Sequence, residues 1–138
     1  MSRKDGERPL DGVRIVDVGN FVSGPYAASV LSEFGAEVIK IEYPIGGDPM
    51  RMLGTPSPRD DSTLFWLSEA RNRKSVTMNL RQPEGAELFR RLVKKCDVVV
   101  ESFRPGTMES WGLGWDVLHE VNPGLVMLRV TGYGQTGP

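Results

Sequence analysis

The chain has 138 residues, a length that suits one globular domain, with 39% hydrophobic and 25% charged residues. The formal net charge of −1 excludes a strong overall field for binding nucleic acid or an anionic membrane. No apolar run approaches the ~18 residues that a membrane-spanning helix needs. One cysteine and one histidine offer no metal-binding set, and Cys96, which cannot form an internal disulfide, favours a reducing cytoplasm.

Strand-like and helix-like segments alternate along the chain. Residues 13–18 are almost continuously apolar, which is typical of a strand covered on both faces. The next segment starts at Pro25 and ends at Gly35, as helices often do. The alternation predicts an α/β fold with a Rossmann-like, mostly parallel sheet and helices on both faces. In chain order we expect strands at 13–18, 37–42, 75–80, 97–100 and 125–130, and helices at 25–34, 62–70, 82–95, 105–111 and 115–121.

The domain organisation expected from the sequence is simple. Residues 1–8 are polar, have no apolar signal core and are expected to be disordered. Residues 9–138 are expected to form a Rossmann-like domain. Within it, residues 43–61 are rich in Pro and Gly, and loops of that length tend to be functional or mobile. Asp61 or Ser62 is expected to cap the helix that follows.

Ligands of open parallel sheets bind beyond the carboxyl ends of the strands, and this rule selects candidate residues here. Three of the five loops that follow the expected strands carry an arginine, namely Arg51, Arg81 and Arg104. The guanidinium group is planar, permanently charged and suited to phosphate. We therefore expect a phosphate-bearing ligand along this edge; the alternative is that the arginines simply gather in exposed loops.

The loop at residues 19–25 matches no standard nucleotide motif. It has glycine at the first and sixth positions of G-x-G-x-x-G but not at the third, and it ends in Gly-Pro-Tyr rather than the Gly-Lys-Ser/Thr of a P-loop. Ser23 lacks the preceding glycine of a hydrolase nucleophile elbow, so it either caps the helix or binds a ligand at the helix N-terminus. Glu42 lies at the position where an acidic residue of an NAD enzyme binds a ribose hydroxyl. Because the G-x-G-x-x-G motif is incomplete, we expect Glu42 to be a surface glutamate instead.

For the other notable residues, a structural role is the first interpretation to consider. The basic run at 71–74 either faces a ligand phosphate or forms a solvated turn. We expect His119 on the surface and Cys96 as a small residue at a helix end. The three tryptophans are expected to pack in the core or an interface, at Trp66, Trp111 and Trp115.

Several segments in combination resemble the N-terminal part of the family III CoA-transferases, also called the CaiB/BaiF family. The resemblance runs from about residue 9 to residue 138, and its specificity lies in the combination rather than in any one piece. The segments are PLDGVRIVDVGNFVSGPYAASVLSEFGAEVIKIE, GGDPMR, ARNRKSVTMNL, PEGAELFRRLVKKCDVVVESFRPG, LGWDVL and NPGLVMLRVTGYGQTGP.

The resemblance implies enzymes that move CoA between an acyl-CoA and a carboxylic acid. It implies a Rossmann-like large domain with CoA along the carboxyl edge of the sheet, of which residues 9–138 would be an incomplete, CoA-binding part. It also implies a small domain and two chains interlocked as a homodimer. No metal is implied. Carried over by position, the CoA-binding candidates are Val22, Ser23, Tyr43, Met78, Asn79, Leu80, Arg81, Ser102, Phe103 and Arg104.

The chain departs from the family pattern at two positions. Tyr43 stands where members often have arginine, and Ser110 stands where some members have another. Arg81 and Arg104 are therefore expected to carry more of the charge that binds phosphate. The aspartate nucleophile that the family implies falls shortly after residue 138, so we expect no catalytic residue in this chain and no activity from the chain alone.

The resulting hypothesis is the CoA-binding part of a family III CoA-transferase in the cytoplasm, acting on acyl-CoA and a carboxylic acid without nucleic acid or membrane as partner. Three alternatives stay open. One is an acyl-CoA racemase of the same family, which the sequence after residue 138 would distinguish. The others are a non-catalytic CoA-binding or scaffold module and an NAD-binding domain.

Overall fold

The fold was analysed in a computed structural model that describes residues 8–136. The disorder expected for residues 1–8 therefore falls almost wholly outside the described residues. Within residues 8–136, five parallel strands form one sheet in the order β3-β2-β1-β4-β5. The elements are β1 (Arg14–Asp17), α1 (Ser23–Glu33), β2 (Glu37–Glu42), the 3-10 helix η1 (Pro49–Met52), α2 (Leu64–Glu69), β3 (Arg73–Thr77), α3 (Pro83–Val93), β4 (Val98–Glu101), α4 (Thr107–Ser110), α5 (Trp115–Val121) and β5 (Val126–Arg129).

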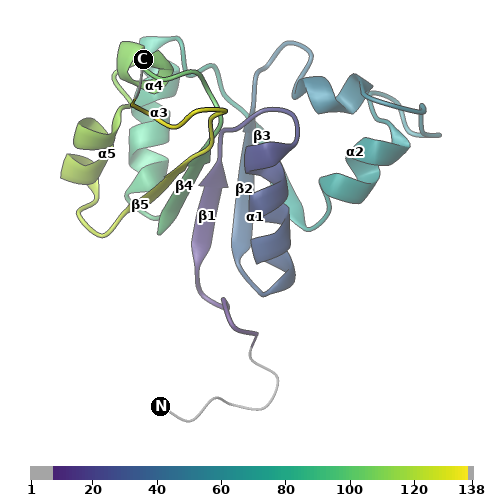
Figure 1. Cartoon of the computed structure of the whole chain (residues 1–138), viewed down its shortest axis with the longest axis horizontal. Coiled ribbons are helices and arrows are strands. Elements are labelled where there is room, and N and C mark those ends of the chain that lie inside the picture. Colours follow the sequence, from purple (N-terminus) through teal and green to yellow (C-terminus); the bar gives the residue numbers. More distant parts are fainter. Residues whose placement is uncertain (1–7, 137–138) are drawn as a thin grey trace.

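Helices cover both faces of the sheet, so the expected α/β, Rossmann-like fold is confirmed (Figure 1). Successive strand residues point to opposite faces. On β1, Ile15 packs with Ala28 of α1, whereas Val16 packs with Phe89 of α3 and Leu118 of α5. These two apolar layers hold α1 on one side of the sheet and α3 with α5 on the other.

The strand order reverses between β1 and β4. The chain runs from β1 outward to β2 and β3, then returns to β4 on the other side of β1. The loops that follow β1 and β4 consequently leave the sheet in different directions. Such a switch point is where open α/β sheets bind ligands, because the diverging loops leave a crevice there.

The element types were predicted correctly, but two local details were wrong. β3 begins at Arg73 rather than residue 75, because Arg73 already pairs with Val38 of β2. The cap of α2 is Thr63, whose side chain accepts a hydrogen bond from the Trp66 N–H at 3.1 Å. The Pro- and Gly-rich loop at residues 43–61 contains the short helix η1, which the sequence analysis did not predict and which Asp48 caps.

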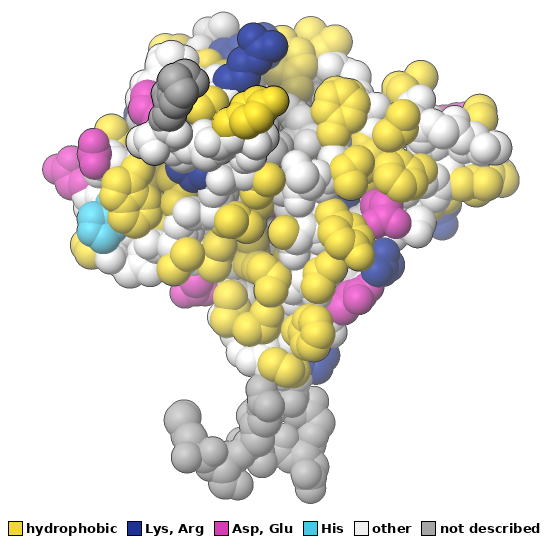
Figure 2. All heavy atoms as spheres, viewed as in Figure 1, with side chains coloured by type: hydrophobic (Ala, Val, Ile, Leu, Met, Phe, Trp, Pro, Cys, Tyr) yellow, Lys and Arg dark blue, Asp and Glu magenta, His cyan; other side chains and the backbone are white. Residues whose placement is uncertain are grey.

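One apolar surface stays uncovered in residues 8–136. On β5, Val126 and Leu128 lie opposite Val98 and Val100, which face the α1 side of the sheet. α1 covers the neighbouring strands but not β5, so Val126 is 60% and Leu128 39% exposed. Figure 2 shows hydrophobic side chains gathered over this face of the molecule.

The helices of the described part of the chain are too short or too polar to cross a bilayer. His119 is exposed, as predicted, and it stacks on Trp115 with the ring centroids 4.7 Å apart. Cys96 lies just after α3, at a helix end as predicted, and it is buried, which raises the pKa of its thiol to about 11. The thiol is therefore protonated near neutral pH and acts as a small apolar group.

Candidate functional site

A small cavity of about 70 Å³ lies where β1, β2, β3 and β4 end. Each of these strand ends contributes lining residues, as the strand-end rule predicts. Six of the ten candidates meet here: Tyr43, Met78, Asn79, Leu80, Arg81 and Phe103. The lining also includes residues that the sequence analysis did not assign to the site: Val18, Asn20, Ile41, Glu42 and Trp111.

Arg81 is the exposed cation of this cavity. Its guanidinium carbon lies 5.5 Å from the ring centroid of Tyr43 and 6.0 Å from that of Trp111. Trp111 in turn meets Phe103 edge-on, with centroids 5.0 Å apart. The positive charge is held by aromatic faces, and within residues 8–136 no carboxylate forms an ion pair with it. The group can therefore bind an anion beside a planar ring.

Trp111 was expected only to pack, and the structure adds a role at the site. It follows α4, and α4 begins directly after the loop that carries Phe103 and Arg104. The place of Trp111 at the site could have been predicted from its position in the sequence. It follows the loop after β4, and the segment after such a loop returns toward the same edge of the sheet. The place of Asn20 could have been predicted in the same way, since it lies in the first loop after β1.

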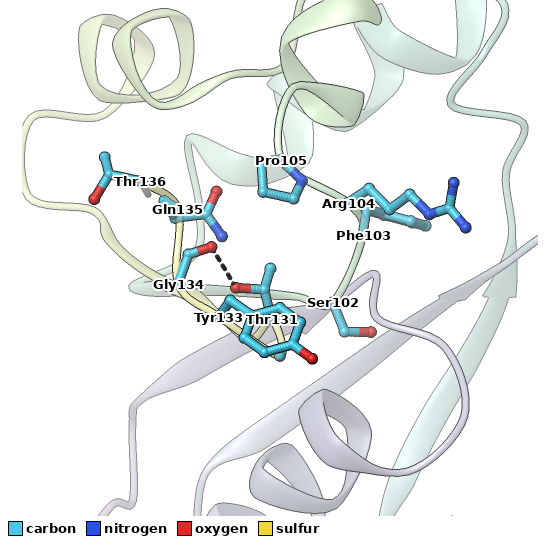
Figure 3. Close-up of a pocket in the computed structure, with 10 residues that line it drawn as sticks. Ser102, Phe103, Arg104, Pro105, Thr131, Tyr133, Gly134, Gln135 and Thr136 are labelled. Carbon is cyan, nitrogen blue, oxygen red and sulfur yellow. Dashed lines mark hydrogen bonds between the residues drawn. The ribbon is translucent and has the colours of Figure 1, made fainter. Parts of the chain in front are cut away.

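A second, open cavity of about 680 Å³ lies on the other side of Phe103. Its walls are the loop from Ser102 to Pro105 and the segment 131–136 that follows β5. Figure 3 shows Pro105 facing Gln135, whereas the Arg104 side chain extends away from the 131–136 segment. Phe103 lines both cavities, so it separates them.

The Ser102 hydroxyl is engaged inside the protein. It accepts a hydrogen bond from the Asn20 N–H at 2.9 Å and donates to the Asn20 carbonyl at 3.3 Å. A Cβ on Gly19 would lie 3.0 Å from the Ser102 hydroxyl oxygen, and one on Gly24 would lie 3.3 Å from the Ser102 Cβ. The two glycines thus let the β1–α1 loop pack closely on the end of β4. This is a physical role for two glycines that the sequence analysis treated only as an incomplete fingerprint.

Val22 and Ser23 lie outside both cavities, at the exposed start of α1. Ser23 does not cap the helix, because the N-cap residue is Val22 and no side chain caps it. Among the described residues, no acceptor receives the N–H groups of Val22, Ser23 or Gly24. These free N–H groups and the helix dipole leave a partial positive charge at this end of α1.

Ionised side chains lie behind the β1–α1 loop, buried or half-buried. Lys40 is 1% exposed, and its Nζ lies 3.0 Å from Asp48 and 3.5 Å from Asp17. A guanidinium nitrogen of Arg73 lies 3.1 Å from Asp17. Three acidic and three basic side chains form what we call the buried charge cluster: Asp17, Glu42 and Asp48 with Lys40, Arg51 and Arg73.

Two interpretations of charged residues were wrong. Glu42 is not a surface residue but is 3% exposed. Arg51 is not a free cation for phosphate, because it donates two hydrogen bonds to Glu42 at 2.7 and 2.8 Å. Its guanidinium carbon also lies 4.1 Å from the Trp66 ring centroid. The loop between β2 and α2 folds back on the end of β2, which buries Glu42 and half-buries Arg51 beside it.

The basic run at 71–74 begins as an exposed turn at residues 71 and 72, which bears out the solvated-turn expectation in part. Its cations bind carboxylates of the first two strands and the first helix. Arg71 donates to Glu33 of α1, Arg73 to Asp17 of β1, and Lys74 to Glu37 of β2. The run therefore fixes β3 against its neighbours and is not available to a ligand phosphate.

Glu42→Gln is expected to change the acid stability of the chain. Burial opposes ionisation of Glu42, but hydrogen bonds from Arg51, Ser75 and the Asp48 N–H outweigh it and lower its pKa from 4.5 to about 2. Because the pKa of Glu42 is lower in the folded state than in the unfolded state, ionised Glu42 stabilises the fold at every pH above its unfolded-state pKa. This stabilisation is lost as the pH falls from there toward 2. Glu42→Gln should therefore lower the free energy of unfolding by about 1–2 kcal/mol at pH 7.

Urea denaturation of both proteins between pH 7 and pH 2 measures this difference. It should stay constant down to about pH 4.5 and then shrink, because protonated Glu42 resembles glutamine. A difference that is unchanged at pH 2 would contradict the assignment.

Comparison with known proteins identifies the family. The family model described as CoA-transferase family III matches residues 10–138. The alpha subunit of succinyl-CoA–L-malate CoA-transferase from Chloroflexus aurantiacus is 69% identical over 94% of this chain and 30% of its own length. Human succinyl-CoA:glutarate CoA-transferase is 42% identical over 95% of this chain and 30% of its own length.

A solved structure agrees with the sequence comparisons. The crystal structure of a CAIB/BAIF family protein from Brucella suis superposes with a TM-score of 0.90 at 38% identity, over 96% of this chain and 35% of that one. The chain thus spans about a third of the length of the proteins that it matches. The family resemblance stated from the sequence segments is confirmed: the chain belongs to CoA-transferase family III.

Proposed function

We propose that this chain supplies the CoA-binding edge of an enzyme that transfers CoA from an acyl-CoA to a carboxylic acid. The observation that carries the proposal is the strand-end cavity in which exposed Arg81 lies between Tyr43 and Trp111. A guanidinium group suits a phosphate, and aromatic faces suit a nucleobase. The relatives named above, which are succinyl-CoA transferases, support the same substrate class.

The rest of CoA is expected to follow the same edge of the sheet. The unpaired N–H groups of Val22 and Ser23 suit the pyrophosphate, because helix N-termini bind anions. Phe103 stands between the nucleotide cavity and the larger one. The larger cavity, with Arg104 and Ser102 in its wall, has room for the pantetheine arm and the acyl group.

The assembly and the compartment are part of the proposal. We assign no catalytic residue within residues 8–136, so another part of the whole enzyme supplies the nucleophile. The uncovered apolar surface on β5 supports contact with a further part of the enzyme or with a second chain of a dimer. The buried, unpaired thiol of Cys96 suits the reducing cytoplasm.

Calorimetric titration of the chain with CoA tests the proposal. We expect saturable binding to CoA and weaker binding to NADH, because the loop at residues 19–25 lacks the dinucleotide fingerprint. Absence of any heat at millimolar CoA would overturn the proposed function. Tighter binding of NADH than of CoA would favour the NAD-binding alternative instead.

Arg81→Ala is expected to weaken CoA binding about tenfold or more, because a charge-assisted hydrogen bond to phosphate is lost. Arg91→Ala is the matched control. Arg91 is also an exposed arginine, but it lies on α3 and lines neither cavity. Calorimetry should show a higher Kd for CoA only for the Arg81 variant. An equal loss in both variants would mean that general positive charge, and not this cavity, attracts CoA.

A further inference from the structure

We propose that Asp48 is a positioning residue of the CoA site, which holds the β1–α1 loop in the conformation that CoA meets. The inference rests on the proposed function. Asp48 is fully buried, and it lies in the loop after β2, 27 residues from the loop that it positions. Nothing in the local sequence around the β1–α1 loop indicates this partner.

The Asp48 carboxylate joins three parts of the chain. Its Oδ1 accepts the Phe21 N–H at 3.1 Å and the Met50 N–H at 2.9 Å. Its Oδ2 lies 3.0 Å from the Lys40 ammonium. The backbone N–H of Asp48 donates to Glu42 at 2.8 Å. Lys40 thus fixes the carboxylate of Asp48 to β2, Glu42 fixes its backbone N–H, and through Asp48 the strand holds Phe21.

Phe21 needs such a partner because its backbone is strained. Its φ is +60°, in the left-handed region that bulky side chains rarely adopt. Strained residues persist where the surroundings hold them, and such residues gather at functional sites. Here Asp48 holds the Phe21 N–H and Ser102 holds the Asn20 N–H. The next two N–H groups along the chain, those of Val22 and Ser23, lie at the N-terminus of α1 and have no acceptor among the described residues.

The charges around position 48 favour a carboxylate there, because the Lys40 ammonium faces it. Lys40 also donates to the carbonyl of Gly19, at the other end of the same loop. Asp17 faces Lys40 as well, but Asp17 is shared with Arg73 and accepts the Gly19 N–H. A buried cation without its carboxylate is strongly unfavourable. Asp48 therefore pairs with the Lys40 ammonium and holds it in place, and Lys40 holds Gly19 while Asp48 holds Phe21.

Titration of the Asp48→Ala and Asp48→Asn variants with CoA, together with amide hydrogen exchange, tests the inference. Asp48→Ala removes the acceptor for Phe21, so the Kd for CoA should rise about tenfold. The amides of residues 20–23 should exchange faster, while those of β1 and β4 stay protected. Asp48→Asn keeps an oxygen that can accept the Phe21 N–H, so its Kd should recover most of that loss, about threefold above the wild type.

Two controls separate positioning from general destabilisation. Asp60→Asn changes an exposed aspartate of the same loop and should leave the Kd unchanged. Val93→Ala truncates a fully buried core residue on α3 that lines neither cavity. It should lower the melting temperature without changing the Kd.

The outcomes distinguish the two proposals. If the wild-type chain does not bind CoA, the proposed function fails and takes this inference with it. If the wild type binds and Asp48→Ala binds equally well, only the positioning role is overturned. A Val93→Ala variant that loses as much affinity as the Asp48 variants would also overturn it, because binding would then follow stability alone. If Asp48→Ala does not fold, the test depends on Asp48→Asn. A Kd for CoA and an amide exchange rate of residues 20–23 that both equal the wild-type values would then contradict the inference.

Discussion

Lys40→Met is expected to destabilise the folded chain by about 3–5 kcal/mol, because it leaves buried carboxylates without their cation. Asp48 Oδ2 is buried and receives no hydrogen bond from the described residues, so the Lys40 charge 3.0 Å away is what compensates it. Asp17 keeps Arg73 but loses Lys40. Methionine fits the volume of the lysine stem, so lost charge rather than a cavity dominates the effect. Urea denaturation at pH 7 measures the change.

The pH dependence gives this prediction a second readout. Burial raises the pKa of Asp17, whereas Lys40 and Arg73 act to lower it. Removing Lys40 raises that pKa further, and a raised folded-state pKa means that stability is gained as the pH falls. The deficit of Lys40→Met against the wild type should therefore shrink on acidification.

Lys74→Met is the matched control for Lys40→Met. Lys74 also pairs with a carboxylate, Glu37, but its side chain is 72% exposed. Exposed pairs contribute about 0–1 kcal/mol, so this variant should stay close to the wild type. Equal losses in the two lysine variants would contradict the assigned difference between a buried and an exposed ion pair.

Gly85→Ala is expected to cost about 1–3 kcal/mol of stability and to weaken CoA binding as well. A Cβ at this position would lie 2.0 Å from the Asn79 carbonyl oxygen, a backbone atom that cannot move alone. The Asn79 side chain accepts the Arg81 N–H at 3.1 Å. Any shift that relieves the contact therefore moves the turn that carries Arg81, the cation of the proposed nucleotide cavity.

Thermal unfolding and CoA titration of the same variant measure the two effects of Gly85→Ala. Gly124→Ala is the control, because the nearest atom to its added Cβ is a side-chain oxygen 3.6 Å away. That variant should keep the stability and the CoA affinity of the wild type. Normal CoA affinity in a destabilised Gly85→Ala would show that the turn and the site are not coupled.

The strand-end rule succeeded at the small cavity for a physical reason. Parallel strands present their carboxyl ends to one edge, so the loops after them must meet there whatever their sequence. Tyr43, Met78 and Arg81 are brought together in this way. The rule does not state which charges remain free at that edge. Arg81 and Arg51 have the same sequence signal, yet only Arg51 is bound to a buried carboxylate.

The sequence by itself determined the types of the elements, the parallel α/β class and the family. Those properties depend on hydrophobic periodicity, on residues that start and end helices, and on short motifs and their order along the chain. Each of these features can be recognised from residues that are close in sequence. Only the tertiary structure decided which ionised groups are buried together and which loop they hold. Asp17, Lys40, Asp48 and Arg73 are distant in sequence, and they meet because β2 lies between β1 and β3. Whether a charge is paired depends on its neighbours in space, and strand order sets those neighbours.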